Sequence, residues 1–269
     1  MKYTVCTTFS ASGYEKYGRR MIQTFLQNWP QEVNLVVYAE NCMVSESAVN
    51  LVVHDLETAS PDMVTFKQNW GLDPRATGQG PTPARKDAGK TFKWDAIRFC
   101  HKVYAVCAAA KTCQTDWLIW MDADMVCHKP IMLDTITQFV PNNQDLCFLG
   151  RCGKFSECGL YAMNLTSEVT GKFLADFKNY YDHPESGIFT LAEWHDSFVF
   201  DAVRKRHALR ELDWTGHIIT GEGHPLINSA WGRYLDHLKG DRKNSGKSWS
   251  NDFKVQRNEP YWQNLQRGS

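Results

Sequence analysis

Two carboxylates, Asp122 and Asp124, follow five apolar residues in the stretch WLIWMDADMV (117–126). A short run of large and branched apolar residues predicts a buried strand. Side chains at positions i and i+2 of an extended chain lie on the same side, so both carboxylates can converge on one point. Two anions that close repel, and one tends to keep its proton. We therefore expect a divalent cation between them; the alternative is a pair of solvated loop carboxylates.

A second group of candidates lies far along the chain, in HLKGDRK (237–243). His237 can supply a third metal ligand, although a lone histidine can also be a surface or capping group. Gly240 lets the backbone approach a ligand closely. Lys243 can place a point charge on a phosphate oxygen. The segment therefore fits a metal and phosphate site when it is combined with the two aspartates.

The elements that must position these residues follow a strand–helix–strand pattern. YTVCTTF (3–9) predicts a strand, 13–29 predicts an amphipathic helix that ends at Pro30, and VNLVVYAE (33–40) predicts a second strand. Such a unit implies a parallel sheet, which binds ligands at the carboxyl ends of its strands. Further helices are expected at 92–110, 166–182 and 189–206, and further strands at 145–150, 159–164 and 208–214. We expect one α/β domain over 1–269, with a mostly parallel, Rossmann-like sheet flanked by helices.

The composition is that of a soluble globular protein. Lys+Arg and Asp+Glu are equal at 30 each, so no global charge indicates a polyanionic partner. The start, MKYTVCTTFS, is too polar for a signal peptide, and no apolar run reaches membrane-spanning length. Nine cysteines form no C-x-x-C pair, which favours free thiols in a reducing compartment. These observations predict a cytoplasmic protein.

Two other interpretations of these segments are possible. LIWMDADMV also resembles the strand plus D-x-D-x-[TV] of haloacid-dehalogenase-type phosphatases, with Asp122 as the nucleophile; a complete strand–helix–strand unit precedes it here, and GDRKNS (240–245) lacks the late second acid of that family. ARKDAGKT (84–91) loosely fits a phosphate-binding loop, but no strand enters it. The Gly/Pro-rich segment 71–91 is instead expected to be a mobile lid.

The order of motifs resembles that of GT-A-fold nucleotide-sugar glycosyltransferases, especially the glycogenin and bacterial galactosyltransferase type. Those proteins have a strand ending in D-x-D, then F-N-x-G-(apolar)3-N, then H-x-x-G-x-x-K-P-W. Here FSECGLYAMN (155–164) keeps Phe155, Gly159 and Asn164, and HLKGDRK supplies the last motif. Glu157 replaces the Asn, and Asn244-Ser245 replace Pro-Trp.

The resemblance implies a role for each candidate residue. The metal ion, Mn²⁺ or Mg²⁺, would be held by Asp122, Asp124 and His237. The donor, a nucleoside-diphosphate sugar and by default a UDP-sugar, would contact Thr7, Thr8, Tyr14, Arg98, Lys102, Gly240 and Lys243. The acceptor hydroxyl would be oriented or deprotonated by Asp196, with Glu157 and Glu222 as further candidates. Tyr14 is equally a candidate core residue, and Arg98 and Lys102 a candidate solvated stripe. Residues 1–124 would form the donor half and 125–269 the acceptor half, and transfer would retain the anomeric configuration.

A looser resemblance is to bacteriophage-encoded glycosyltransferases that modify DNA. It predicts a 5-hydroxymethylpyrimidine base as the acceptor and the host cytoplasm as the location. The segments 72–94 and 239–257 carry net charges of +3 and +4, and Trp249 and Phe253 interleave with the second. A glycan, protein or small-molecule acceptor stays open, as does a non-catalytic binding module. The oligomeric state is not predicted.

Overall fold

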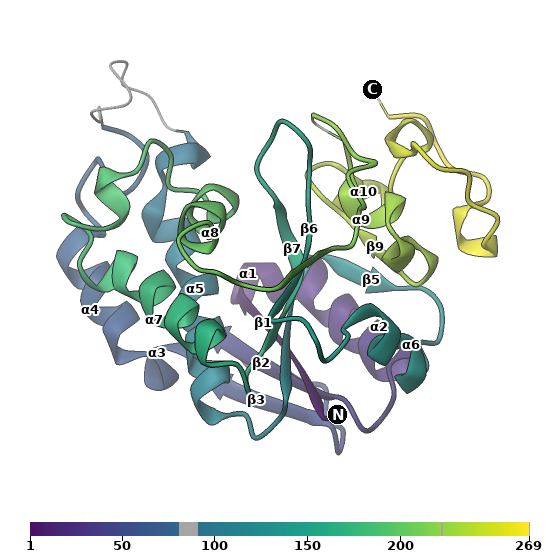
Figure 1. Cartoon of the computed structure of the whole chain (residues 1–269), viewed down its shortest axis with the longest axis horizontal. Helices are drawn as coiled ribbons and strands as arrows, with labels where there is room; N and C mark the ends of the chain where they lie inside the picture. Colours follow the sequence, from purple (N-terminus) through teal and green to yellow (C-terminus); the bar gives the residue numbers. More distant parts are fainter. Residues whose placement is uncertain (81–90, 222, 269) are drawn as a thin grey trace.

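Seven strands form a central sheet in the order β3-β2-β1-β4-β7-β6-β8 (Figure 1). The computed structural model describes residues 1–80, 91–221 and 223–268. The strands are β1 (Tyr3–Ser10), β2 (Asn34–Glu40), β3 (Leu51–Asp55), β4 (Trp117–Met121), β6 (Leu146–Leu149), β7 (Glu157–Asn164) and β8 (Glu211–Asp213). The pairs β1–β2, β2–β3, β1–β4 and β6–β8 are parallel, whereas β7 is antiparallel to both β4 and β6. The prediction of one mostly parallel α/β domain is confirmed.

Helices cover both faces of this sheet. One face packs against α3 (Leu56–Ala59), α4 (Pro61–Trp70), α5 (Ala96–Thr112), α7 (Glu168–Asp182) and α8 (Asp196–Arg204). The other face packs against α2 (Arg19–Asn28), α6 (Leu133–Phe139) and α9 (Pro225–Asn228). The remaining helical segments are short. They are α1 (Ala11–Gly13), α10 (Arg242–Ser245) and 3₁₀ turns at Phe92–Trp94, Ile188–Thr190, Ala230–Arg233, Ser250–Asp252 and Pro260–Trp262.

Strand β4 lies in the middle of the sheet, and both of its faces are buried. Leu118 and Trp120 belong to the core beneath α5 and α7, whereas Ile119 and Met121 belong to the core beneath α2. Burial on both faces explains why the strand is continuously apolar in sequence. The chain can therefore turn polar only where β4 leaves the sheet, and Asp122 is the first residue after it.

A separate antiparallel pair joins β5 (Met125–Cys127) to β9 (Leu235–His237). In its register Met125 lies opposite His237 and Val126 opposite Asp236. The segment after β9 fastens this strand, because the buried Asp236 carboxylate accepts hydrogen bonds from Ser248 N (2.9 Å), Ser248 Oγ (2.5 Å) and Tyr261 Oη (3.0 Å).

Several element boundaries differ from the sequence-based expectation. The helix expected over 189–206 begins only at Asp196, because His195 caps it from an extended conformation. The helix expected over 13–29 contains a π-helical turn at Tyr14–Gly18. The strand expected over 208–214 is confined to Glu211–Asp213. Residues 81–90 of the lid expected over 71–91 lie outside the described residues, and so does all of the loop-like motif 84–91 except Thr91.

All nine cysteines are free, in agreement with the expected thiols. None of the helices in the described parts of the chain has the length and apolar character needed to cross a membrane.

Candidate functional site

The turn between β4 and β5 carries both aspartates and is fixed by backbone hydrogen bonds. Asp122 N donates to Gly159 O of β7 (2.8 Å), and Met125 N donates back to Asp122 O (3.1 Å). Leu238 N, just after β9, donates to Asp124 O (3.0 Å). The turn is therefore attached to two other strands.

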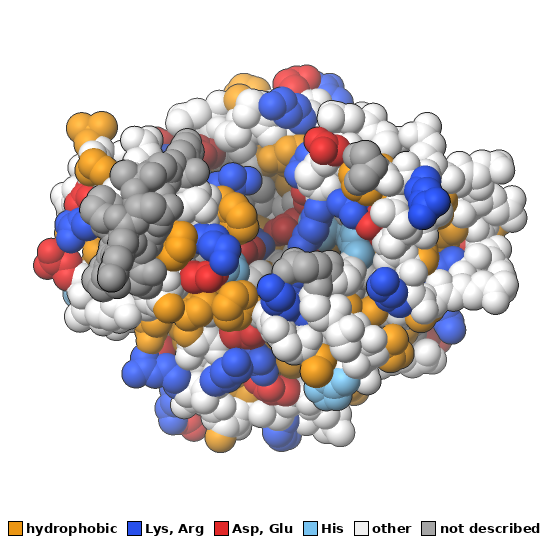
Figure 2. Space-filling model, turned by 90° about the horizontal axis from the view of Figure 1, so that it is seen from above, with side chains coloured by type: hydrophobic (Ala, Val, Ile, Leu, Met, Phe, Trp, Pro, Cys, Tyr) orange, Lys and Arg blue, Asp and Glu red, His pale blue; other side chains and the backbone are white. Residues whose placement is uncertain are grey.

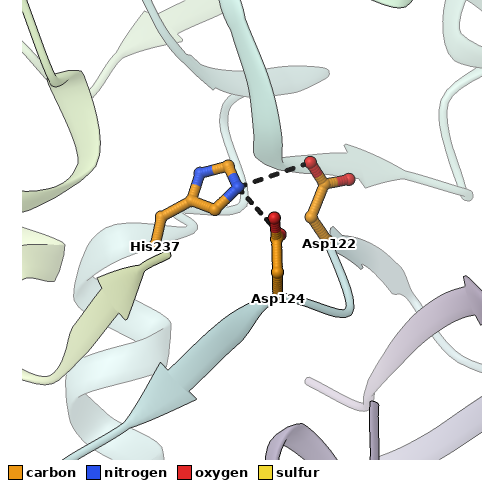
Figure 3. Close-up of side chains that lie close together, drawn as sticks. All are labelled: Asp122, Asp124 and His237. Atoms are coloured by element: carbon orange, nitrogen blue, oxygen red, sulfur yellow. Dashed lines mark ion pairs between the residues drawn. The ribbon is translucent and has the colours of Figure 1, made fainter. Parts of the chain in front are cut away.

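His237 reaches this turn because β9 pairs with β5. Its Nε2 lies 3.0 Å from Asp124 Oδ1 and 3.6 Å from Asp122 Oδ2 (Figure 3). One ligand atom from each of the three residues lies within 4.8 Å of the others. The imidazole is only 1% exposed, so its direction is set by packing. The sequence-predicted ligand set is thus brought together in space.

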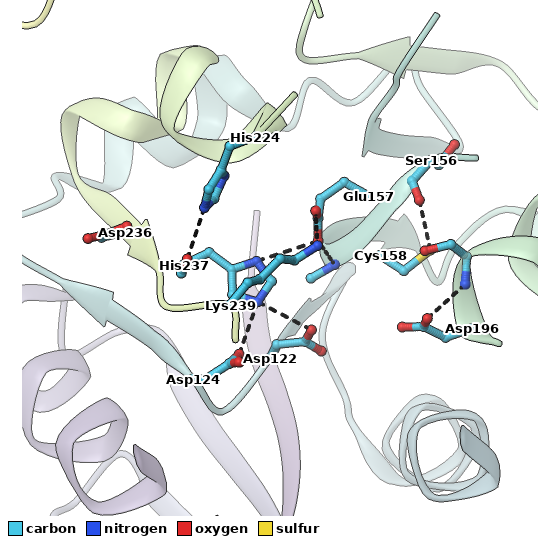
Figure 4. A network of polar contacts seen from close by, with 12 residues as sticks. Asp122, Asp124, Ser156, Glu157, Cys158, Asp196, His224, Asp236, His237 and Lys239 are labelled. Atoms are coloured by element: carbon cyan, nitrogen blue, oxygen red, sulfur yellow. Dashed lines mark hydrogen bonds and ion pairs between the residues drawn. The ribbon is translucent and has the colours of Figure 1, made fainter. Parts of the chain in front are cut away.

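Glu157 lies behind the imidazole, on the side away from the aspartates (Figure 4). Its Oε1 lies 3.4 Å from His237 Nδ1 and accepts a hydrogen bond from Gly159 N (3.0 Å). Its other oxygen forms an ion pair with Lys239. Burial by itself lowers the pKa of His237, but the Asp124 and Glu157 carboxylates raise it to about 9. Glu157 is therefore placed to orient His237, rather than to contact an acceptor as the sequence suggested.

Lys102 is buried, at 8% exposure, between two carboxylates. Its Nζ lies 2.8 Å from Asp122 Oδ1 and 2.5 Å from Asp196 Oδ2, and it donates to Cys158 O (2.9 Å). Burial lowers the pKa of Lys102, yet the two aspartates override it and raise the pKa above its usual value. Lys102 is therefore not part of a solvated stripe, and in this structure its charge is balanced by two carboxylates.

A cavity of about 390 Å³ opens beside the aspartates, and we call it the metal-side cavity. Four of the predicted donor contacts line it, namely Thr8, Arg98, Lys102 and Lys243. Lys243 Nζ lies 2.7 Å from Asp124 Oδ2. The space-filling view shows a hollow in this face of the molecule, with Lys or Arg, acidic and His side chains around it (Figure 2). The cavity combines two carboxylates with cations that an anionic ligand can contact.

Three predicted donor contacts do not line this cavity. Thr7 is fully buried within β1. Tyr14 is 2% exposed, stacks on Phe9 with ring centroids 5.5 Å apart, and donates to Glu46 Oε2 (2.6 Å), so it is a core residue. Gly240 has a positive φ of 54° and shapes the turn before Lys243. Glu222 lies outside the described residues.

Asp196, the first residue of α8, lines the same cavity. Burial raises the pKa of Asp196, but the Lys102 ammonium outweighs burial and keeps the pKa below its usual value. The carboxylate is therefore an ionised hydrogen-bond acceptor and a weak base.

Other cavity residues were missed in the sequence. Tyr17, Glu40 and His101 line the metal-side cavity. Tyr17 lies in the π-helical turn, a distortion that often marks functional sites, but nothing in the sequence reveals that turn. Glu40 ends β2, a position that the strand-end rule could have identified. The His101 ring, together with Lys67, lowers the pKa of Glu40 to about 2.

The two basic segments are largely neutralised inside the fold. Of their described cations, six form ion pairs: Arg75 with Asp73, Lys93 with Glu193, Lys239 with Glu157, Lys243 with Asp124, Arg242 with Asp252 and Arg257 with Glu259. Arg257 donates to Ile227 O, and Lys247 donates to Tyr261 O. Arg85, Lys86 and Lys90 lie outside the described residues. Most of the cations that the structure describes in these segments are therefore already paired within the protein.

No family model matches the sequence, and no curated protein sequence matches it. In fold the chain is similar to the WbbM bifunctional glycosyltransferase, with a TM-score of 0.48 and 10% identity over 80% of this chain and 39% of that chain. It is similar to mouse xyloside xylosyltransferase 1, with a TM-score of 0.46 and 12% identity over 79% of this chain and 85% of that chain. A glycosyltransferase involved in glycosylation of the major capsid of PBCV-1 gives a TM-score of 0.46 and 11% identity over 91% of this chain and 98% of that chain.

Proposed function

We propose that this protein is a metal-dependent glycosyltransferase, which moves a sugar from a nucleoside-diphosphate sugar to a hydroxyl acceptor. The observation that carries the proposal is the meeting of Asp122, Asp124 and His237 at the edge of a cavity that also holds Arg98 and Lys243. Ligands in α/β sheets of this kind bind at the carboxyl ends of the strands, which is where this group lies.

The three side chains fit a divalent cation. Two carboxylates and one imidazole within 4.8 Å match the oxygen and nitrogen ligands of Mn²⁺ or Mg²⁺, and the imidazole favours Mn²⁺. In this structure the negative charges of Asp122 and Asp124 are balanced by ion pairs with Lys102, Lys243 and His237. When bound, the ion supplies Lewis-acid stabilisation of the negative charge on a departing diphosphate.

The chain's own residues divide the remaining work. Lys243 and Arg98 supply positive charge for the diphosphate oxygens, and Thr8 and Tyr17 line the cavity for the rest of the donor. Asp196 accepts a hydrogen bond from the acceptor hydroxyl and orients it. The hydroxyl oxygen bonds to the anomeric carbon as the bond from that carbon to the diphosphate breaks. Because Asp196 is a weak base, the hydroxyl proton leaves to the departing diphosphate.

The phosphatase alternative has less support. A nucleophilic Asp122 needs a free carboxylate oxygen, but Oδ1 binds both Lys102 and Trp120 Nε1 (2.7 Å). Oδ2 faces His237. A non-catalytic binding module has no need of this full ligand set.

A UDP-sugar donor and retention of configuration stay predictions of the resemblance. A 5-hydroxymethylpyrimidine base in DNA, the acceptor favoured from the sequence, has less support than a glycan, protein or small molecule. The reason is that the described cations of segments 72–94 and 239–257 are mostly paired internally. Binding to duplex DNA depends on free cations that displace counterions from phosphates.

The experiment is a screen of nucleotide-sugars with Mn²⁺, read by release of free nucleoside diphosphate. We expect release from at least one donor, its loss in excess EDTA, and its return when Mn²⁺ is restored. Full release in EDTA would end the metal-dependent proposal. A phosphoryl group trapped on Asp122 would support the phosphatase instead.

A further inference from the structure

A second and larger cavity, of about 910 Å³, runs beside α8, and we call it the α8 groove. Its walls are the β6–β7 loop (150–156), α8 and β8. The residues of α8 that line the groove, Asp201 and Arg204, lie in the second half of the helix; Lys205 follows the helix and Glu193 precedes it. Its Glu193 end lies three residues from Asp196, which lines the metal-side cavity. None of the described residues lines both cavities, but both cavities come close to the start of α8.

Aromatic side chains lie between the two cavities, around the start of α8. The His195 ring, which caps α8, has Phe92, Phe99, Phe155 and Phe198 around it, with centroids 6.0, 6.4, 5.3 and 6.3 Å away. Phe99 lines the metal-side cavity, and Phe155 lines the α8 groove. Phe92 is 53% exposed. This aromatic cluster gives a bound molecule an apolar surface between the two cavities.

The polar lining of the groove is nearly balanced in charge. Lys93 pairs with Glu193 (2.9 Å), and Arg204 pairs with Asp201 (3.1 Å) and Glu211 (2.5 Å). The fourth lining carboxylate, Asp213, accepts from Gly150 N (2.8 Å) and Thr215 Oγ1 (2.8 Å). Among the described residues that line the groove, five Lys or Arg side chains accompany four carboxylates. A strongly charged ligand therefore has little to gain there.

We propose that the α8 groove binds an uncharged, polyhydroxylated acceptor, an oligosaccharide, whose terminal hydroxyl reaches Asp196. Each sugar hydroxyl both donates and accepts hydrogen bonds, so alternating fixed cations and carboxylates suit it. The C–H face of a sugar ring packs on aromatic rings such as Phe155 and Phe92. A polynucleotide would need a surplus of free cations instead.

This inference rests on the proposed function, because the groove is an acceptor site only if a donor occupies the metal-side cavity. In the reaction, the oligosaccharide oxygen forms the new bond to the anomeric carbon. The carbon–oxygen bond to the diphosphate breaks, and the hydroxyl proton leaves with that diphosphate.

The test applies the labelled protein, with Mn²⁺ and UDP, to an array. The array carries neutral oligosaccharides, sialylated and sulfated oligosaccharides, and duplex DNA containing 5-hydroxymethylcytosine. We expect binding to neutral oligosaccharides that falls by at least about tenfold in Phe155→Ala. Phe155→Tyr keeps the ring and should bind within about threefold of the unchanged protein. Met132→Ala removes an apolar side chain that is 68% exposed at the start of α6, and it should have no effect.

Each other result has a separate meaning. Absence of binding to any neutral oligosaccharide, with binding of UDP and Mn²⁺ intact, would overturn the inference and leave the proposed function standing. Binding confined to DNA or to acidic oligosaccharides would overturn it in favour of an anionic acceptor. Equal binding by Phe155→Ala, in a variant with an unchanged melting temperature, would remove the groove from the acceptor site. Failure to bind any nucleoside diphosphate with Mn²⁺ would contradict the proposed function itself.

Discussion

Lys102 and Asp122 form a buried ion pair, with Nζ 2.8 Å from Oδ1, and the same ammonium holds Asp196 at 2.5 Å. One cation from the middle of α5 therefore joins a candidate metal ligand to the carboxylate at the start of α8. Removal of one partner from a buried pair leaves an uncompensated charge, which is far less favourable than the pair itself. The ammonium that lines the metal-side cavity therefore also holds the start of α8 in place.

We expect Lys102→Met to lower the free energy of unfolding by up to about 3–5 kcal/mol, because the half-buried carboxylates of Asp122 and Asp196 then lose their shared cation. Urea denaturation measures this change. Lys111→Met, at an exposed position in the last turn of the same helix, should change it by less than about 1 kcal/mol. Equal stability of the two variants would show that the buried pair contributes nothing.

Asp124→Asn should abolish Mn²⁺-dependent release of nucleoside diphosphate and leave the fold intact, since the amide keeps the shape but loses the ligand charge. A titration with Mn²⁺, in which electron paramagnetic resonance measures the concentration of the free ion, reports the loss of binding. Asp134→Asn, at an exposed position in the first turn of α6, is the matched control. Normal Mn²⁺ binding by Asp124→Asn would place the metal elsewhere.

Glu157→Gln should weaken Mn²⁺ binding by about 10–100-fold, because a carboxylate behind a ligating histidine orients the ring and raises its basicity. The same titration measures this effect. Glu168→Gln removes an exposed carboxylate that pairs with Lys172 (2.6 Å) on α7, and it should bind Mn²⁺ normally. An unchanged affinity of Glu157→Gln for Mn²⁺ would mean that Glu157 does not act on the metal site through His237, and that its role is limited to the ion pair with Lys239.

Stability should fall as the pH falls from about 6.5 to 4. Burial lowers the pKa of His128 to about 4, and its ring stacks on Tyr261 with centroids 4.0 Å apart. The unfolded chain binds a proton at this histidine in that interval and the folded chain does not, so acid favours unfolding, by at most about 1.4 kcal/mol per pH unit.

His128→Phe keeps the stacked ring and removes the proton site. Its free energy of unfolding, from urea denaturation at several pH values, should therefore decrease less than that of the unchanged protein over this interval. His224, whose pKa burial also lowers to about 4, acts in the same direction in both proteins. Identical pH profiles would mean that His128 does not contribute.

The sequence predicted the parts of the molecule that depend on local pattern. The apolar run before Asp122 and the strand–helix–strand start were enough to predict the parallel half of the sheet and the strand end that carries the aspartates. His237 was found from its motif, although only the β5–β9 register explains its position. The burial of Lys102 was not visible, because it depends on a partner, Asp196, that lies far away in sequence. The core position of Tyr14 was one of two interpretations that the sequence left open, and its contact with Glu46 decides between them. The α8 groove involves four separate segments and has no local signature.

The pairing of β5 with β9 also has a consequence for synthesis. A ribosome adds residues in order, so a nascent chain that has not reached Leu235 already contains both aspartates but lacks the imidazole. Contacts between distant segments form late, because a long loop must first close. The candidate site with all three ligands can therefore form only after β9 has left the ribosome and paired with β5. Until then the turn after β4 carries two of the three candidate ligands, and the third joins them only through the register of β5 with β9.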